Sequence, residues 1–312
     1  MTPVASQRMA NVDWVALPVP PSLLGESPFW HPDEAALYWC DIPGRKLNRF
    51  EPARAAHRQW SFECEPACCA PLPGGALLLA MRDGIFRFDP ESGERSRLAK
   101  PPYDPAQMRF NDGKADPLGR LWVSTVFEPR TAPRAALYRF AGGRIEVMAE
   151  GATVGNGIAF SPDARTLYWS DTTSHRIFAF DFDLAAQAIS NRRVLVQFPL
   201  KTEGEGVGEE LSRYGGRPDG AAVDVEGALW VAMFEGQRLL RLDAHGRILC
   251  DLALPVRCPT MPCFGGPDLK TLFVTTSREK RPAAELAAQP LAGAVLSLRV
   301  EVPGLPVNFA RA

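Results

Sequence analysis

A short strand that opens with leucine recurs six times along the chain, and this repetition limits the possible folds more than any other feature. The strands read L-Y-W-C-D, L-L-L-A-M, L-W-V-S-T, L-Y-W-S-D, L-W-V-A-M and L-F-V-T-T, and they begin at residues 37, 77, 121, 167, 229 and 272. A period of about 40–50 residues is typical of propellers, whose repeats bury their apolar faces only against neighbouring repeats.

Each leucine strand lies between a turn and another alternating strand. Turns such as D-P-L-G-R (116–120) come before it, and strands such as R-I-F-A-F-D-F-D (176–183) follow it. Clusters of Pro, Asp and Gly mark hairpins. Helical periodicity is confined to A-A-E-L-A-A-Q (283–289), which predicts one short helix. The pattern predicts an all-β six-bladed β-propeller. A two-sheet sandwich is the alternative, and the regular register of the strands disfavours it.

We expect residues 1–312 to form a single propeller domain. The last repeat begins near residue 262 and needs a strand from the other end of the chain, since an open sheet edge invites aggregation. The run D-W-V-A-L-P-V-P (13–20) is the expected closing strand.

Charge and composition favour a small-molecule partner. The 35 Lys and Arg residues against 36 Asp and Glu give a net charge of −1, so no global field attracts nucleic acid or an anionic membrane. The N-terminus has no apolar signal-peptide core, and no apolar run is long enough to span a bilayer. Seven cysteines without CxxC spacing predict buried, reduced side chains. These features predict a cytosolic protein.

Polar residues recur at one position of the repeat. Counting back 10 or 11 residues from each leucine reaches the predicted innermost strand at Glu26, Pro66, Asn111, Asn156, Asp219 and Met261. Equivalent positions of successive blades converge on the propeller axis, so four oxygen-bearing side chains are expected to meet there. Two carboxylates and two amides suit Ca²⁺, Mg²⁺, Mn²⁺ or Fe²⁺ better than a structural zinc. The alternative, that the Asp-Gly and Asn-Gly pairs are only hairpin turns, does not explain their common register.

Other candidate groups lie outside this register. His31 and His175 fall beside predicted turns, and we expect solvated side chains rather than ligands or bases. The segment 200–217 accounts for the longest step between repeats. We expect it to cover the channel mouth and to shape substrate choice, as long functional loops often do.

At these motifs the sequence resembles the gluconolactonase and regucalcin (senescence marker protein) family of sugar lactonases. Within that family it most resembles the bacterial aldonolactonases. The resemblance covers nearly the whole chain. It is carried by L-G-E-S-P-F-W (24–30), R-F-N-D-G-K (109–114), D-P-L-G-R-L-W (116–122), I-S-N-R-R (189–193), P-D-G-A-A-V-D (218–224) and P-C-F-G-G-P-D-L-K-T-L-F-V-T-T (262–276).

The resemblance implies a hydrolase that opens aldonolactones to aldonic acids with metal-activated water. It implies one divalent metal ion, which could be Ca, Mn, Mg, Zn or Fe(II), held by Glu26, Asn156 and Asp219. Asp219 would also be the catalytic acid/base. Arg109 and Asn111 would contact the substrate.

The chain departs from the animal members of that family after the third-blade strand. Those members carry consecutive carboxylates there, whereas this chain reads F-E-P (127–129), which leaves Glu128 for the sugar contact. Two other functions fit a related propeller: a metal-dependent esterase or organophosphate hydrolase, and a non-enzymatic calcium-binding or scaffold protein. The polar channel and Arg109 favour catalysis.

Overall fold

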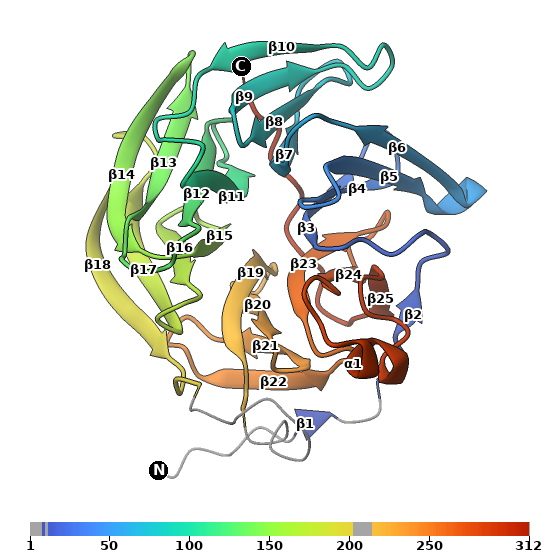
Figure 1. The fold of residues 1–312 in the computed structure, drawn as a ribbon. Helices are drawn as coiled ribbons and strands as arrows, with labels where there is room; N and C mark the ends of the chain where they lie inside the picture. Colours follow the sequence, from blue (N-terminus) through green and yellow to red (C-terminus); the bar gives the residue numbers. More distant parts are fainter. Residues whose placement is uncertain (1–7, 10–11, 202–213, 312) are drawn as a thin grey trace.

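The structure, a computed structural model that describes residues 8–9, 12–201 and 214–311, is a six-bladed β-propeller, as the repeat predicted. Six sheets surround a central axis, and the first strand of each sheet lies nearest to that axis (Figure 1). These inner strands are β3 (Gly25–His31), β7 (Pro66–Pro71), β11 (Met108–Ala115), β15 (Gly155–Phe160), β19 (Arg217–Val223) and β23 (Pro259–Gly265).

The predicted leucine strands form the second strand of every blade. They are β4 (Ala36–Asp41), β8 (Leu77–Met81), β12 (Leu121–Phe127), β16 (Thr166–Asp171), β20 (Leu229–Phe234) and β24 (Thr271–Thr276). The third strands, also predicted, are β5 (Lys46–Glu51), β9 (Gly84–Phe88), β13 (Ala135–Ala141), β17 (Arg176–Asp183), β21 (Arg238–Leu242) and β25 (Leu296–Arg299).

In four blades the outermost strand directly follows the third strand in the sequence. In the other two blades it comes from the N-terminal part of the chain. Four blades end in β6 (Ala56–Ser61), β10 (Arg95–Ala99), β14 (Arg144–Ala152) and β18 (Ala188–Gln197). In the sixth blade β2 (Val15–Ala16) lies antiparallel beside β25. In the fifth, β22 (Ile248–Ala253) is followed by β1 (Arg8–Met9), which pairs with it in parallel and was not expected from the sequence.

Two short helical turns complete the described elements. The helix α1 (Ala283–Ala288) lies within the predicted segment, and a 3₁₀ turn spans Pro52–Arg54. No helix in the described part of the chain is long and apolar enough to cross a membrane.

Apolar side chains fill the space between neighbouring blades, and Trp39, Trp122 and Trp169 are among the largest that are fully buried. Two blades hold a tryptophan in the same way. Asp116 accepts a hydrogen bond from Trp122 Nε1 at 2.8 Å, and Asp224 accepts one from Trp230 Nε1 at 2.8 Å. All seven cysteines are free, as their spacing predicted. Five are also buried as predicted, whereas Cys64 and Cys250 are half-buried.

A register shift interrupts the pairing of every inner strand with its second strand. The shifts lie between Glu26 and Phe29, Pro66 and Cys68, Phe110 and Gly113, Asn156 and Ala159, Pro218 and Ala221, and Pro259 and Met261. A bulge adds a residue to one strand and re-aims a side chain. The polar residues of the predicted register therefore sit where the inner strands are free to turn them toward the axis.

The C-terminal tail lies against the opposite ends of the inner strands. Leu305 N donates to Val223 O at 3.2 Å, and Ala310 N donates to Pro71 O at 2.7 Å. Asn308 Nδ2 donates to Ala115 O at 3.0 Å. Val223, Pro71 and Ala115 are the last residues of their strands, so the tail covers the end of the axis away from the polar register.

Candidate functional site

A cavity of about 510 Å³ opens where the inner strands begin. Its wall combines residues of the inner strands with residues that directly follow the second strands. All of the predicted site residues line it: Glu26, Arg109, Asn111, Glu128, Asn156 and Asp219. Side chains from four blades, up to 193 positions apart in the sequence, therefore share one cavity.

The two predicted carboxylate ligands are buried and poorly hydrogen-bonded. Glu26 Oε2 accepts from Ser27 N at 3.2 Å, and no described residue donates a hydrogen bond to the Asp219 carboxylate. Burial, then repulsion by Asp219, raises the pKa of Glu26 well above its usual value. Burial also raises the pKa of Asp219 to about 8, against the attraction of Arg217. The nearby arginines therefore do not offset the burial of either carboxylate, and a buried carboxylate needs such a compensating positive charge.

Asp112 adds a third negative group behind this pair. It is buried, its Oδ2 accepts from Ile158 N at 2.8 Å, and its Oδ1 has no hydrogen-bond partner among the described residues. Its charge raises the pKa of both Glu26 and Asp219. Asp112 and the half-buried Lys114, whose Nζ donates to Ala221 O, belong to the motif F-N-D-G-K, but inner-strand counting gave no reason to select them.

A chain of hydrogen bonds links the amides across three blades. Arg109 Nη1 donates to Asn111 Oδ1 at 2.7 Å, and Asn111 Nδ2 donates to Asn156 Oδ1 at 2.7 Å. Asn156 Nδ2 then donates to Thr172 Oγ1 at 2.8 Å, and Thr172 Oγ1 donates to Pro218 O at 2.8 Å. A guanidinium only donates and a backbone carbonyl only accepts, so the two ends fix the direction of the whole chain.

That direction leaves the Asn156 oxygen, rather than its nitrogen, on the side away from Thr172. A carbonyl oxygen has two lone pairs, so Asn156 Oδ1 can accept from Asn111 and also bind a cation. Together with Glu26 and Asp219 it forms a hard-oxygen set of the kind that divalent cations prefer. The described residues contain no metal-binding group of three or more His, Cys, Asp or Glu side chains; here the third donor is an amide. The donor set and the two under-neutralised carboxylates fit one divalent cation.

Glycines let neighbouring blades approach this set closely. A Cβ on Gly220 would lie 2.4 Å from Met261 Cβ in the next blade. Gly157 has a φ of +61°, and a Cβ there would lie 2.9 Å from Asp219 O. The glycines after Asn156 and Asp219 are thus required by contacts between blades.

Glu128 lines the cavity but is held by two arginines. Arg82 donates to both of its carboxylate oxygens at 2.8 and 2.9 Å, and Arg109 Nε lies 3.7 Å from Oε1. Arg82 also donates to both oxygens of Glu65. The hydrogen bonds from Arg82 keep the pKa of Glu128 below its usual value. An ionised Glu128 can accept hydrogen bonds from a ligand at the cavity wall.

Sequence counting missed the residues that directly follow the second strands. Ile42, Arg82, Thr172 and Ser277 each occupy that position and line the cavity, as Glu128 does in the third blade. The same repeat that located the inner strands could have found them, by counting forward from each leucine instead of back.

The expectation that the histidines are solvated was wrong. His31 and His175 are buried, with exposed fractions of 2% and 3%. His31 lies at the end of β3, where the ring of Phe309 from the tail packs edge-on against it. His175 Nδ1 lies 2.6 Å from Pro199 O, and Nε2 lies 3.3 Å from the Tyr214 hydroxyl. A turn lies beside each histidine, as predicted. Packing of Phe309 from the tail against His31, and of Tyr214 against His175, nevertheless excludes solvent from the two rings.

The expectation for the 200–217 segment stays a prediction, since residues 202–213 lie outside the described residues.

Comparisons with known proteins place the chain in a family. Residues 24–278 match the model of the family described as SMP-30/Gluconolactonase/LRE-like region. The 6-deoxy-6-sulfogluconolactonase of Pseudomonas putida is 41% identical over 285 residues, which cover 91% of this chain and 94% of that protein. Regucalcin of Oryctolagus cuniculus is 33% identical over 291 residues, which cover 90% and 93%.

A solved structure has the same fold. The crystal structure of a calcium-binding protein, regucalcin, from Agrobacterium tumefaciens matches with a TM-score of 0.87 and 27% identity, and the match covers 95% of this chain and 97% of that one. The family match spans the cavity residues from Glu26 to Asp219. The chain therefore belongs to the SMP-30/gluconolactonase family, as its motifs predicted, and is an enzyme of the lactonase class.

Proposed function

We propose that this chain is a metal-dependent hydrolase that opens sugar lactones to the corresponding aldonic acids. The observation that carries the proposal is the meeting of Glu26, Asn156 and Asp219 in one cavity, with two buried carboxylates that need a cation. The names of its relatives support a sugar lactone as substrate. The calcium-binding relative of known structure supports a divalent cation.

Glu26, Asn156 and Asp219 would hold the cation. A divalent ion at such a set polarises a carbonyl group and makes water a nucleophile near neutral pH. Asp219 takes the proton of the attacking water on a carboxylate oxygen while the water oxygen bonds to the lactone carbonyl carbon. The bond from that carbon to the ring oxygen then breaks, and Asp219 returns the proton to the ring oxygen, which becomes a hydroxyl group. Atoms and charge balance without another reactant.

Arg109, Asn111 and Glu128 would orient the sugar. Arg109 donates to the Phe110 carbonyl as well as to Asn111, so its guanidinium is held firmly beside the cavity. Asn111 spends its amide nitrogen on Gly155 O and Asn156 Oδ1, so it also positions Asn156, and the second lone pair of its Oδ1 is what it offers to the sugar. Glu128 supplies an acceptor for a sugar hydroxyl. We place the reaction in the cytosol, a reducing compartment in which seven free thiols persist.

The test uses protein stripped of metal with a chelator and then supplied with single divalent ions. Acid release is followed for a panel of aldonolactones and, for comparison, for aryl esters. We expect activity that depends on the added ion and that favours sugar lactones over aryl esters. Equal turnover by the stripped protein would contradict metal dependence, and a preference for aryl esters would favour the esterase function.

A further inference from the structure

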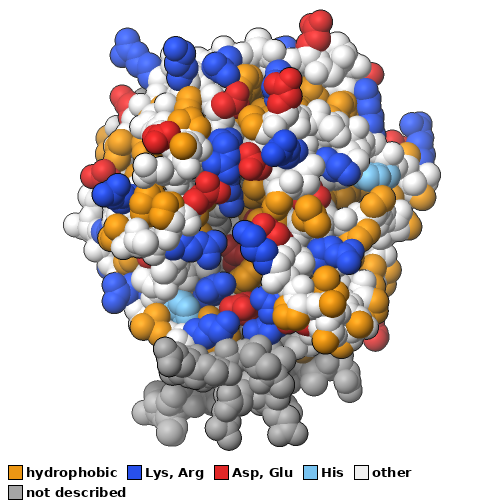
Figure 2. All heavy atoms as spheres, viewed as in Figure 1, with side chains coloured by type: hydrophobic (Ala, Val, Ile, Leu, Met, Phe, Trp, Pro, Cys, Tyr) orange, Lys and Arg blue, Asp and Glu red, His pale blue; other side chains and the backbone are white. Residues whose placement is uncertain are grey.

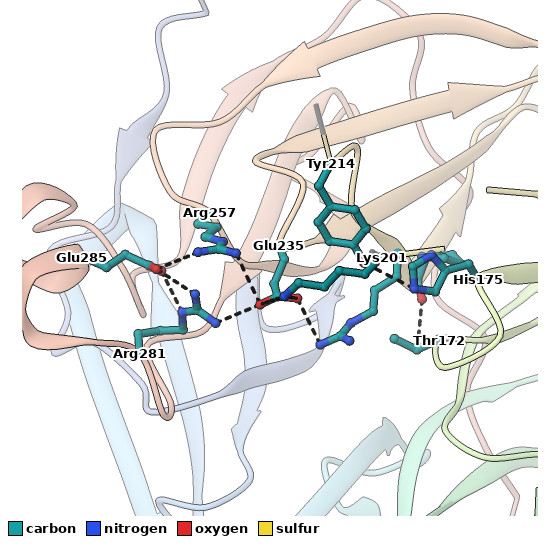
Figure 3. A network of polar contacts seen from close by, with 10 residues as sticks. Thr172, His175, Lys201, Tyr214, Glu235, Arg257, Arg281 and Glu285 are labelled. Carbon is teal, nitrogen blue, oxygen red and sulfur yellow. Dashed lines mark hydrogen bonds and ion pairs between the residues drawn. The ribbon is translucent and has the colours of Figure 1, made fainter. Parts of the chain in front are cut away.

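One side of the cavity mouth holds more positive than negative charge. The buried Glu235, directly after β20, is surrounded by four cations: Arg281 Nη1 and Lys201 Nζ at 3.0 Å, Arg217 Nη2 at 3.4 Å and Arg257 Nη2 at 3.5 Å. Figure 3 shows Lys201, Arg257 and Arg281 directed at this one carboxylate from different parts of the chain.

Glu285 is the second carboxylate of the cluster. It comes from α1 and accepts from Arg281 at 2.7 Å and from Arg257 at 3.0 Å. Four cations thus share two carboxylates, which leaves a surplus of two positive charges within this cluster of described residues. Arg217 also attracts Asp219, whose charge the proposed cation would offset. Burial raises the pKa of Glu235, yet the attraction of Arg217 and Lys201 outweighs it and the net pKa is lowered. Burial of Glu285 is likewise outweighed by hydrogen bonding from Arg281, which lowers its net pKa, so both carboxylates are ionised and already carry their full negative charge, and the surplus of two positive charges remains.

The surplus faces the cavity. Arg217 and Arg281 line the cavity wall, whereas neither Glu235 nor Glu285 does within the described residues. The carboxylates thus lie behind the guanidinium groups. On the face seen in Figure 2, blue Lys and Arg side chains surround the hollow over the central axis, and red acidic side chains lie inside it.

Arg217 has donors to spare. Its contact to Glu235 is long, and its buried Nε has no hydrogen-bond partner among the described residues. Its guanidinium also lies 5.1 Å from the centre of the Phe234 ring, which holds it by a cation–π contact. A buried donor without a partner costs free energy, so the contacts within the described residues do not fully satisfy this guanidinium. A planar guanidinium with free N–H groups is the side chain best suited to bind two oxygens of one anion.

We propose that Arg217 and Arg281 form an oxyanion-binding subsite of the lactone cavity, which takes a negatively charged group carried by the substrate at the end away from its lactone carbonyl. The inference rests on the proposed function, because it assigns one end of the same substrate. The shared chemistry is that of a sulfonate or phosphate group, which carries three oxygens in a compact tetrahedral head.

The spacing along β19 fits such a substrate. Arg217 precedes Asp219 by two residues on this strand. Two residues of extended strand advance roughly 6–7 Å. If the carbonyl group of a six-carbon lactone lies at Asp219, its sixth carbon and the charged group on that carbon would therefore lie within reach of Arg217. The subsite therefore selects for charge at that distant carbon and not for the ring itself.

The test compares three lactones on the metal-loaded protein: neutral gluconolactone, 6-phosphogluconolactone and 6-deoxy-6-sulfogluconolactone. We expect a higher kcat/KM for one or both anionic lactones, and a KM for them that rises with salt. In Arg217→Gln the ratio of kcat/KM for the anionic to the neutral lactone should fall about tenfold or more, since a hydrogen bond to a charged group has that effect. Arg281→Gln should lower the same ratio. Arg299→Gln removes an equal charge from the third strand of the sixth blade, β25, and should leave the ratio unchanged.

A binding measurement separates this inference from the proposed function. Calorimetry compares 6-phosphogluconate and gluconate, which differ only in the distal charged group, on the wild type and on Arg217→Gln. Tighter binding of 6-phosphogluconate that Arg217→Gln abolishes supports the subsite, even if no lactone is hydrolysed and the proposed function fails. Equal binding of the two compounds, or an equal loss on neutral and anionic lactones in Arg217→Gln, would overturn the subsite while leaving neutral lactone hydrolysis intact. Thermal melting of each variant identifies any loss of fold. If Arg217→Gln does not fold, Arg217→Lys replaces that variant in both assays.

Discussion

Asn156 Nδ2 donates to Thr172 Oγ1 at 2.8 Å, and this bond determines which atom of the Asn156 amide faces the candidate metal site. Thr172 spends its own proton on Pro218 O, so its oxygen can only accept from Asn156. The amide nitrogen is thereby held on the Thr172 side, which leaves the oxygen as the atom available to a cation in the cavity that Glu26 and Asp219 also line. Without that acceptor the amide could rotate and turn its nitrogen toward the cation.

Thr172→Val is therefore expected to weaken divalent-cation binding by about tenfold to a hundredfold, the range found when groups that orient metal ligands are removed. The change keeps the shape of the side chain and removes only the hydroxyl. Thr172→Ser keeps the hydroxyl and should bind the cation as the wild type does. Calorimetric titration of the metal-free protein gives both affinities. Equal affinities in Thr172→Val and the wild type would mean that other contacts orient Asn156.

Asp219→Asn should retain the fold and lose most lactone turnover, since it removes both a negative ligand and the proposed acid/base. General acid–base catalysis alone contributes about 10²–10⁴-fold, so kcat should fall by at least that range. Asp163→Asn, in an exposed turn, is the matched control and should keep its kcat. Steady-state kinetics with saturating metal provide the values. Unchanged lactone hydrolysis by Asp219→Asn would refute the role of Asp219.

The metal-free protein should lose stability as the pH rises. The pKa of Asp219 is about 8 in the folded chain, whereas an unfolded aspartate has a pKa near 3.9. Between these values the folded state keeps a proton that the unfolded state has released. The stabilisation is therefore complete below the unfolded pKa and is lost toward pH 8. For one proton, the free energy of unfolding falls by up to about 1.4 kcal/mol per pH unit.

Urea unfolding in the presence of a chelator, at several pH values between about 5 and 8, measures this slope. Asp219→Asn cannot titrate at this position, so its slope should be smaller by up to one proton. Glu26, whose pKa is also raised, leaves a residual slope in that variant. Saturating divalent metal should flatten the wild-type curve, because the cation replaces the protons. An identical slope in the wild type and Asp219→Asn would show that Asp219 is ionised throughout.

The centre of the site was predictable because it depends on the repeat alone. Glu26, Asn156 and Asp219 lie 10 or 11 residues before the leucine strands, and propeller symmetry brings equivalent positions of the blades to one axis. The bulge that turns them inward also recurs in each blade, although no residue pattern announced it. Such features repeat with the fold and need no knowledge of distant contacts.

The rim of the cavity was less predictable because it depends on pairings across blades. Arg82 meets Glu128 of the next blade, and Arg281 of the sixth blade meets Glu235 of the fifth. No offset within a single repeat reports which charges these residues will face. The buried histidines failed for the same reason: His31 is covered by Phe309, which lies 278 positions away. Tertiary packing decided both cases.

The tryptophan clamp of the fifth blade should be a main source of stability. Asp224 is fully buried and accepts from Trp230 Nε1 and Arg241 Nε, both at 2.8 Å. Asp224→Ala leaves the indole and the guanidinium without their acceptor, and breaking a buried ion pair costs about 3–5 kcal/mol. Asp243→Ala removes a carboxylate from a similar turn, but its partner Arg247 is mostly exposed, so the expected cost is about 1 kcal/mol or less.

Chemical denaturation of both variants with metal present compares the two carboxylates directly. The two substitutions delete the same atoms from turns of the same blade, so a difference of about 2 kcal/mol or more between them would reflect burial and the tryptophan partner. Asp116→Ala should behave like Asp224→Ala, since Asp116 holds Trp122 and Arg120 in the third blade by the same contacts. Similar small losses in all three variants would mean that turn geometry, rather than the buried clamp, holds these blades together.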